Sequence, residues 1–188
     1  MPRALVSWSS GKDSAFALHE ARRDLDVVGL VTTVTTAYQR VSMHGVRDVL
    51  LAQQAAATGL PLYRVEIPAA CTNEVYEQEL LAVLSAAQVT HVVFADLFLA
   101  DIRTYREQLL ARVGLECVFP LWQRDTHALA HEMIAAGLRA TLTCVDLAKL
   151  DAAFAGRAFD AALLADLPAH IDPCGENGEF HTFVTAGP

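Results

Sequence analysis

Six residues near the start of the chain have the types and order of a phosphate-binding loop. Ser9, Ser10, Gly11, Lys12, Asp13 and Ser14 follow a short apolar run and precede an apolar-periodic segment, which predicts a strand, a tight loop and a helix. Backbone N–H groups at a helix start lack partners within the helix, and with the helix dipole they suit an anion such as phosphate. Gly11 lets the backbone approach a ligand closely. Asp13 would repel phosphate unless Mg²⁺ bridges the two, so it is the candidate metal ligand.

The spacing of this loop separates two classes of phosphate site. It lacks the GxxxxGK[ST] pattern of a Walker A loop. It resembles the SGGxDS loop of the N-type ATP pyrophosphatases, the PP-loop family, with Ser10 where the first Gly usually stands. The resemblance implies that ATP is the cofactor, held by the six loop residues and by Thr33. The alternative is an ordinary N-capped helix after a strand.

A second candidate cluster lies near the end of the chain. Glu176 and Glu179 flank Asn177-Gly178, a strong two-residue hairpin signal. If that hairpin forms, the two carboxylates lie opposite each other. Neighbouring carboxylates raise one pKa, which suits a base that accepts a proton from ammonium. The pair could equally bind Mg²⁺ or ammonium, or be a solvated acidic turn.

Other side chains are candidates for substrate binding or proton transfer. Arg103, Arg106 and Arg124 could hold a carboxylate or phosphate bidentately, although a surface ion pair with Glu107 or Asp101 is the alternative for Arg106. The remaining candidates are Asp96 at a strand end, Trp122 as a stacking surface or core edge, Cys174 as a nucleophile, and His44 and His181 as acid–base groups or bystanders.

The hydrophobic pattern predicts alternating strands and helices. The expected strands are Ala4 to Val6, Asp26 to Val34, Leu62 to Ile67, Thr90 to Asp96, Glu116 to Leu121 and Leu138 to Val145. The expected helices are Ala15 to Leu25, Met43 to Thr58, Thr72 to Ala87, Asp101 to Val113, Thr126 to Ala136 and Asp160 to Leu167. This alternation is typical of the α/β class: an open, mostly parallel, Rossmann-like sheet with helices on both faces, here with a C-terminal β-hairpin.

The same pattern predicts where the polar residues meet. Ligands bind beyond the carboxyl ends of the strands in such folds. We therefore expect one shared rim formed by Ser9 to Ser14, Thr35 to Ser42, Asp96, Arg103, Trp122 to Arg124 and Asp146.

Composition limits the class of protein and its partners. The 188 residues suit one domain, 1–188, and 53% hydrophobic content indicates a globular chain. No apolar run reaches the length of a membrane span, and a net charge of −8 makes nucleic acid an unlikely partner. The four cysteines form no CxxC pair, and the N-terminus has no secretory pattern. We therefore expect a cytoplasmic protein with reduced cysteines, and homo-oligomerisation stays open.

A wider resemblance links the two clusters. Ala95-Asp96, Arg103, Arg106, Leu121-Trp122-Gln123-Arg124, Gly137 and the run from Cys174 to Thr182 together resemble the diphthine–ammonia ligase family, a PP-loop branch whose C-terminal motif reads CGEGGEYET. Here residues 174–179 read CGENGE. Asn177 replaces a Gly, His181 a Glu, and Ala95 the Gly of a Gly-Asp pair. This variant tail is similar to that of bacterial relatives.

The family resemblance implies a reaction and roles for the residues. A carboxylate substrate attacks ATP to form an acyl-adenylate and pyrophosphate, and ammonia then displaces AMP to give an amide. Lys12, Glu176, Glu179 and Arg124 are the implied catalytic residues, Asp13 is the implied Mg²⁺ ligand, and Asp96, Arg103, Arg106 and Trp122 bind the substrate. Two other functions remain open: a non-catalytic adenine-nucleotide-binding module and a sulfur-inserting, tRNA-modifying PP-loop enzyme.

Overall fold

Five parallel strands form the main sheet. The computed structural model describes residues 1–188. The strands β1 (Arg3–Ser7), β2 (Asp26–Thr35), β4 (Leu62–Ile67), β5 (His91–Val93) and β6 (Glu116–Val118) lie in the order β4-β2-β1-β5-β6. The two-residue β3 (Arg40–Val41) pairs antiparallel with the end of β2. The chain proceeds outward from β1 on one side and from β5 on the other, so the ligand crevice of a doubly wound sheet is expected at the ends of these two strands.

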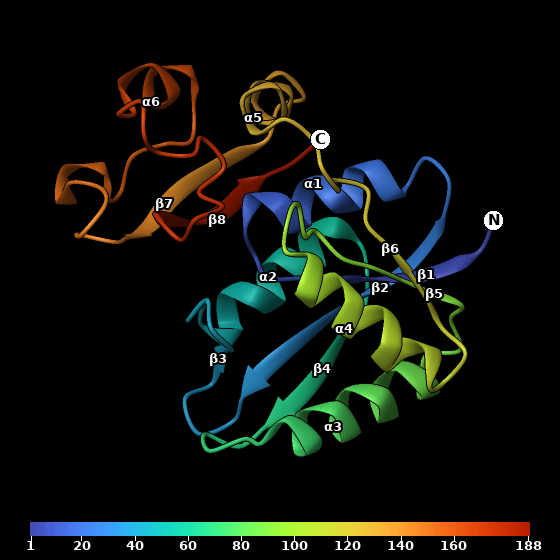
Figure 1. Ribbon diagram of the computed structural model, residues 1–188. Coiled ribbons are helices and arrows are strands. Elements are labelled where there is room, and N and C mark those ends of the chain that lie inside the picture. Colours follow the sequence, from blue (N-terminus) through green and yellow to red (C-terminus); the bar gives the residue numbers. More distant parts are fainter.

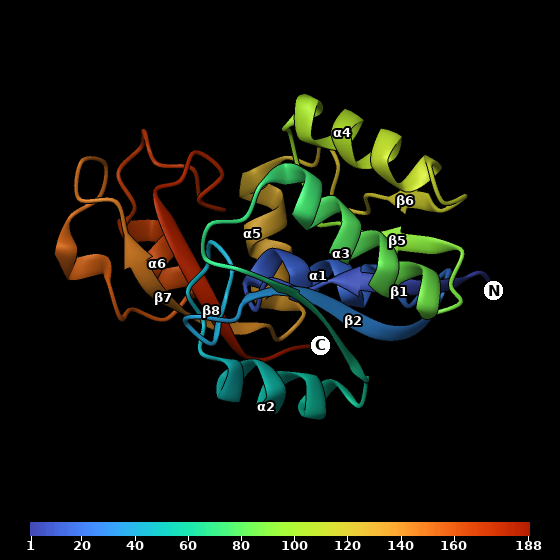
Figure 2. The same cartoon turned by 90° about the horizontal axis from the view of Figure 1, so that it is seen from below.

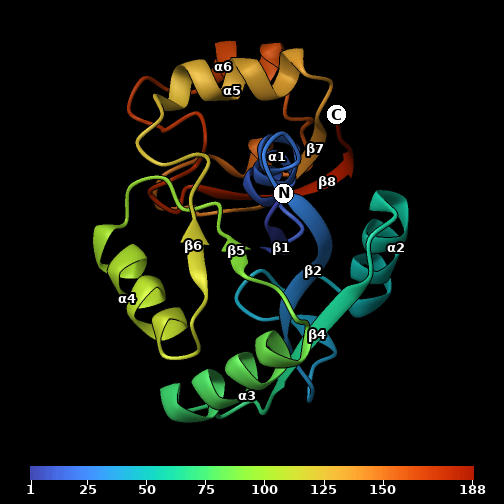
Figure 3. The same ribbon diagram turned by 90° about the vertical axis from the view of Figure 1, so that its right-hand side faces the viewer.

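Each face of the sheet is buried against helices. Ala4 and Val6 of β1 belong to the larger core cluster, whereas Leu5 belongs to the smaller one, as the alternation of side chains along a strand requires. The helices α1 (Lys12–Ala21) and α2 (Asp48–Thr58) contribute to the larger cluster, and α3 (Asn73–Ala86) and α4 (Ala100–Ala111) to the smaller one. Figure 3 shows α3 and α4 on one side of the sheet and α1 on the other. The predicted mostly parallel α/β sheet with helices on both faces is therefore confirmed.

The last third of the chain forms a separate layer, which we call the C-terminal unit (residues 126–186). It contains α5 (Thr126–Ala135), β7 (Arg139–Val145), a short 3₁₀ helix η1 (Ala152–Phe154), α6 (Ala161–Asp166) and β8 (Phe180–Ala186). The strands β7 and β8 pair antiparallel in a two-stranded sheet of their own. Figures 1 and 2 show this unit beside the main sheet, with β8 running toward α1.

The C-terminal antiparallel pair was predicted, but its turn and its place in the fold were not. β8 begins at Phe180, and Val145 pairs with Phe180, so the whole segment 146–179 connects the two strands. The prediction of a two-residue hairpin at Asn177-Gly178 is wrong, and with it the cross-strand pairing of Glu176 with Glu179. Because β7 lies outside the main sheet, the prediction that Asp146 joins the shared rim is also wrong. Its carboxylate instead accepts a hydrogen bond from the Ala148 backbone N–H.

One continuous core joins the C-terminal unit to the main sheet. The larger cluster contains Phe16 of α1 and Leu30 of β2 together with Met133 of α5, Leu142 of β7 and Phe180 of β8. Burial of these side chains fixes β8 against α1, and therefore fixes the segment before β8 against the loop before α1. None of the helices combines the length and apolar character needed to cross a membrane.

Candidate active site

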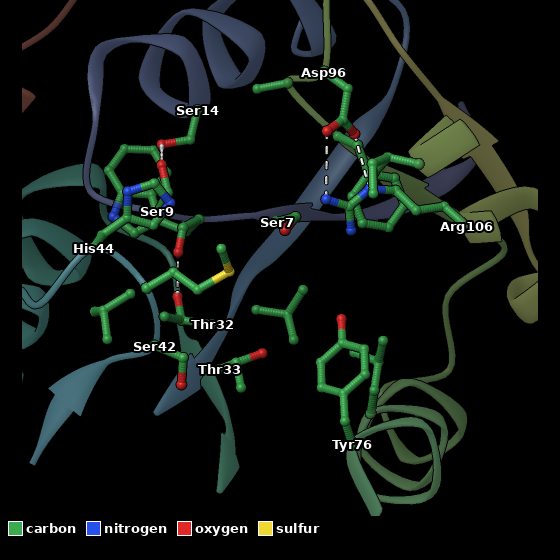
Figure 4. Close-up of a pocket in the computed structure, with 18 of the residues that line it drawn as sticks. Ser7, Ser9, Ser14, Thr32, Thr33, Ser42, His44, Tyr76, Asp96 and Arg106 are labelled. Carbon is green, nitrogen blue, oxygen red and sulfur yellow. Dashed lines mark hydrogen bonds and ion pairs between the residues drawn. The ribbon is translucent and has the colours of Figure 1, made fainter. Parts of the chain in front are cut away.

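A large cavity opens at the carboxyl ends of β2, β1 and β5. It has a volume of about 780 Å³, within the range of pockets that hold small molecules and cofactors. Figure 4 shows its two ends: Ser9, Ser14 and His44 lie on one side, and Asp96 and Arg106 on the other. The predicted residues that line it are Ser9, Asp13, Ser14, Thr33, Asp96 and Arg106.

The loop between β1 and α1 turns tightly at Ser10. This residue has φ +74° and is fully buried, and its hydroxyl has no hydrogen-bond partner. A left-handed conformation costs an L-residue about 1–2 kcal/mol, which explains why the related loops have a glycine here. Ser9 Oγ accepts a hydrogen bond from the Gly11 N–H and donates one to Ser14 Oγ. Ser10 therefore adopts the tight left-handed turn, although it stands where the related loops have glycine.

Lys12 does not face the cavity. Its ammonium is 2% exposed, donates to both carboxylate oxygens of Asp13 at 2.8 Å, and also donates to the backbone carbonyl of Cys174. Burial by itself would lower the pKa of Lys12, but the negative charge of Asp13 raises it above its ordinary value. Lys12 is therefore a buried, charged link between the phosphate loop and the C-terminal unit.

The strand β8 binds the same loop through its backbone and one hydroxyl. Thr182 Oγ1 accepts from the Lys12 N–H at 3.1 Å, and the Val184 N–H donates to the Ser10 carbonyl at 3.0 Å. Gln54 of α2 donates to the carbonyls of both Ser10 and Val184. The loop is thus fixed from two sides before any ligand binds. Neither Thr182 nor Gln54 was predicted, because no local pattern marks a contact between distant segments.

Glu176 has the electrostatic environment of a proton-transfer group. It is half-buried, and its carboxylate makes no hydrogen bond within the protein. Burial, reinforced by the negative charge of Asp13, raises the pKa of Glu176 to about 7. A carboxyl group with this pKa can accept and release a proton near neutral pH. The prediction that one member of the acidic pair has a raised pKa therefore agrees with the structure, although its cause is not Glu179.

Glu179 has the opposite environment. It is 2% exposed, and its carboxylate accepts hydrogen bonds from the backbone N–H groups of Asp172 and Asn177 and from the Asn177 side chain. Burial alone would raise the pKa of Glu179, but these donors hold it below its ordinary value. An ionised carboxylate with three donors does not suit a base.

The far end of the cavity is built around Asp96 and Arg106. Arg106 Nε lies 2.8 Å from Asp96 Oδ2, outside ordinary hydrogen-bond geometry, and Nη2 donates to Oδ1 at 3.4 Å, so charge holds the pair together. The guanidinium also lies 4.3 Å from the centre of the Phe94 ring. Tyr76 of α3, which the sequence did not single out, lines the same end.

The cavity lining does not include Arg103, Trp122 and Arg124 of the predicted rim, nor the acidic residues Glu176 and Glu179. Arg103 pairs with Glu107 and stacks against both Phe119 and Trp122, at 4.8 and 4.7 Å from the ring centres. Arg124 pairs with Glu20 of α1 and Glu132 of α5. The segment after β6 therefore lies at the predicted rim. The side chains of Arg103 and Trp122 contact each other there, and Arg124 contacts neighbouring helices.

Of the remaining candidates, His44 lines the cavity and Cys174 does not. His44 lines the cavity with its ring 5.1 Å from that of His181, and burial together with His181 lowers its pKa below the usual value. The Cys174 thiol is buried and donates to the Thr126 carbonyl, and burial raises its pKa to about 12. A nucleophilic role for Cys174 does not fit, since the thiolate is the nucleophile.

Comparison with known proteins agrees with this architecture. The family model described as diphthamide synthase N-terminal domain matches residues 2–117, and the model described as diphthamide synthase C-terminal domain matches residues 125–188. The boundary between the two models coincides with the passage from the main sheet to the C-terminal unit.

Relatives cover the chain to different extents. A human protein named diphthine–ammonia ligase is 28% identical over 207 residues, covering 94% of this chain and 76% of that protein. The mouse protein of the same name is 29% identical over 209 residues, with the same coverage. The Schizosaccharomyces pombe protein of that name is 34% identical over 86 residues, which is 44% of this chain but only 14% of that protein. With both halves of the chain matched in order, this protein belongs to the diphthamide synthase family.

Proposed function

We propose that this protein is an ATP-dependent ligase that activates a carboxylate as an acyl-adenylate and transfers ammonia to it. The observation that carries the proposal is the contact of Lys12 with the Cys174 carbonyl. It joins the segment containing Glu176 to the loop whose Ser9, Asp13 and Ser14 line the cavity. The names of the relatives, diphthine–ammonia ligase, support the reaction class.

The loop end of the cavity suits ATP. The start of α1 offers backbone donors to the phosphates, and Thr33 at the end of β2 lines the wall where the nucleoside would lie. The donors that receive the pyrophosphate charge are fixed beforehand, because β8 holds the loop. Such preorganised donors stabilise charge that develops on a leaving group.

Asp13 is the residue that would hold Mg²⁺. Its carboxylate lines the cavity and is partly exposed, and Mg²⁺ binds proteins through one or two carboxylates together with substrate phosphates. This carboxylate fits the ion in kind, and Mg²⁺ would share its oxygens with the Lys12 ammonium. When bound, Mg²⁺ would neutralise charge on the departing pyrophosphate.

The far end of the cavity suits the carboxylate substrate. Arg106 is the cation there, and a guanidinium has enough donors to keep Asp96 and still bind a second carboxylate. Asp96 keeps Arg106 in place, so the substrate would be oriented toward the α-phosphorus. Holding both reactants in one cavity supplies the proximity that the first step needs.

Glu176 would serve the second step. Ammonium must lose a proton before its nitrogen can attack the adenylate, and a carboxylate with a pKa of about 7 can accept that proton at neutral pH. Attack of ammonia on the acyl-adenylate then displaces AMP, and the product is an amide.

Product analysis tests this proposal. The protein is incubated with ATP, Mg²⁺ and ammonium, with and without a cell-metabolite extract, and the nucleotide products are identified. AMP and pyrophosphate that depend on the extract are expected. ADP and phosphate would contradict the mechanism, and ATP that stays bound and intact with every extract fraction would favour a nucleotide-binding module. Binding of tRNA that survives moderate salt would favour the tRNA-modifying class.

A further inference from the structure

Two carboxylates, the half-buried Asp172 and the buried Glu179, hold the segment 172–179, which we call the CGENGE loop after its last six residues. Asp172 and Glu179 stand at its two ends, and every hydrogen bond that their side chains accept comes from this loop or from Thr126 at the start of α5. The loop has no regular secondary structure, so these bonds replace the backbone ladder that would otherwise fix its shape.

We propose that Glu179 and Asp172 are positioning residues that hold Glu176 toward the phosphate loop, and that Glu179 takes no part in proton transfer. This inference rests on the proposed role of Glu176. It separates two acidic residues that the sequence motif presents as an equivalent pair.

Glu179 closes one side of the loop. Its Oε2 accepts from the Asn177 N–H at 2.9 Å, and its Oε1 accepts from the Asp172 N–H and from Asn177 Nδ2, both at 3.1 Å. These donors lie on both sides of Glu176 in the sequence, so the carboxylate of Glu179 fixes the backbone from which Glu176 projects. The buried carboxylate cannot leave its donors without a large desolvation cost.

Asp172 closes the other side and ties the loop to α5. Its Oδ1 accepts from the N–H groups of Cys174 and Glu176 at 2.7 and 3.4 Å, and Thr126 Oγ1 donates to its Oδ2 at 2.7 Å. The Cys174 carbonyl, which belongs to the same turn, then accepts from Lys12. A chain of contacts thus runs from α5 through Asp172 to the phosphate loop.

Gly175 and Asn177 are two positions of the CGENGE loop whose residue type affects how the loop is held. Gly175 has φ +74°, and a Cβ there would lie 3.1 Å from Phe180, so only glycine fits. Asn177 stands where the related motif has a glycine, and its side-chain amide supplies one of the three donors to Glu179. This chain therefore holds Glu179 with a contact that the glycine motif cannot make.

A double-mutant cycle tests whether Glu179 acts through Glu176. Glu179→Gln replaces an acceptor oxygen by a donor and should lower kcat for amide formation at least ~10-fold. The KM for ATP should change less than ~2-fold, because the Glu179 side chain makes no hydrogen bond to the phosphate loop. Glu176→Gln should lower kcat further, and the double variant should be no slower than Glu176→Gln alone. Multiplied losses in the double variant would assign Glu179 an independent catalytic role, and wild-type kcat in Glu179→Gln would overturn the proposal.

A spectroscopic readout keeps the proposal testable without turnover. In protein carrying ¹³C-labelled glutamate, the Glu176 carboxyl signal is the one absent from Glu176→Gln, and it should move in Glu179→Gln and, by less, in Asn177→Ala. Asp160→Asn is the matched control, because Asp160 caps α6 in the same unit by accepting from Leu163 and touches no residue of the loop. A Glu176 signal unchanged in Glu179→Gln and Asn177→Ala would overturn the positioning role. If wild-type protein forms no AMP, the ligase proposal fails. The Glu176 carboxyl signal still shows whether Glu179 positions Glu176.

Discussion

The ammonium of Lys12 donates a hydrogen bond to the backbone carbonyl of Cys174, which is 162 positions away in the sequence. Lys12 follows the tightest turn of the phosphate loop, and Cys174 lies in the CGENGE loop. The two motifs that are farthest apart in the chain are therefore joined at one buried charge. Ligand binding at the loop and the environment of Glu176 are expected to be coupled through this contact.

Replacement of Lys12 tests the strength of this junction. Lys12→Met keeps much of the side-chain volume but leaves Asp13 and the Cys174 carbonyl without their partner. We expect the free energy of unfolding to fall by about 2–3 kcal/mol, less than the cost of breaking a fully buried pair, because the Asp13 side chain is 26% exposed. Urea denaturation measures the change.

The matched control is Arg64→Met. Arg64 pairs with Asp48 at 3.0 Å, but both side chains are more than one-third exposed. Such pairs contribute about 0–1 kcal/mol. Equal losses in the two variants would show that the Lys12 contact has no special role.

The turn at Ser10 predicts a stabilising substitution. Ser10→Gly removes a left-handed serine and a buried hydroxyl that has no partner. The gain is partly offset by the greater freedom of glycine in the unfolded chain, so we expect the free energy of unfolding to rise by about 0.5–1 kcal/mol. Thermal and urea denaturation at one protein concentration would measure it.

Ser85→Gly controls for the residue change itself. Ser85 lies exposed in the last turn of α3, where glycine costs at most about 0.5 kcal/mol relative to serine. We therefore expect the free energy of unfolding to rise in Ser10→Gly and to fall in Ser85→Gly. A loss of stability in Ser10→Gly would mean that the Ser10 side chain has a favourable role in the loop.

The raised pKa of Glu176 predicts a pH-dependent stability difference. Its folded pKa of about 7 exceeds the ordinary glutamate value of 4.5, so the folded state binds the proton more tightly than the unfolded state. The stabilising contribution is full below about pH 4.5 and is lost as pH rises through about 7. The free energy of unfolding of the wild type, relative to Glu176→Gln, should therefore fall between these two pH values. Denaturation curves of both proteins across this range give the difference, and a difference independent of pH would refute the assignment.

Arg106 predicts a selective loss of substrate binding. Arg106→Met removes the cation at the far end of the cavity and leaves Asp96 unpaired there. We expect the KM for the carboxylate substrate to rise at least ~10-fold, since charge-assisted hydrogen bonds contribute about 1.5–3 kcal/mol, with the KM for ATP nearly unchanged. Steady-state kinetics with each substrate varied in turn separates the two constants.

Arg112→Met, at the C-terminal end of α4, serves as the control. Arg112 follows α4 and forms an exposed ion pair with Glu77, away from the cavity lining. It should leave both KM values unchanged. A rise in the KM for ATP in Arg106→Met, rather than for the acid, would place the nucleotide at the wrong end of the cavity.

The sequence predicted what is periodic or local. The β-branched run of β2, the loop from Ser9 to Ser14 and the cap at Thr72 each depend on neighbouring residues, and each is found where expected. The carboxyl ends of β1 and β5 then meet because parallel strands share an edge, which brings Asp96 to the same cavity as Ser9.

The predictions that depended on distant contacts were less accurate. Asn177-Gly178 has the composition of a hairpin turn, yet the pairing partner of β8 is β7, more than thirty residues earlier, so the local signal was overridden. Arg124 has the charge to bind a substrate, but α1 and α5 place Glu20 and Glu132 beside it. Glu176 and Glu179 have the same side chain in one motif, and only burial and the hydrogen-bond donors around each give them different pKa values.

Exchange of labelled pyrophosphate into ATP tests whether the protein forms an acyl-adenylate. The reaction contains Mg²⁺ and a carboxylate-containing metabolite fraction but no ammonium, so only formation and reversal of the acyl-adenylate can move the label. The proposed mechanism predicts exchange that depends on the fraction, is lost in Asp13→Ala, and persists in Glu176→Gln, because the role proposed for Glu176 is in the ammonia step alone. No exchange in the wild type with any fraction that supports AMP formation, or equal loss of exchange in Glu176→Gln, would contradict it.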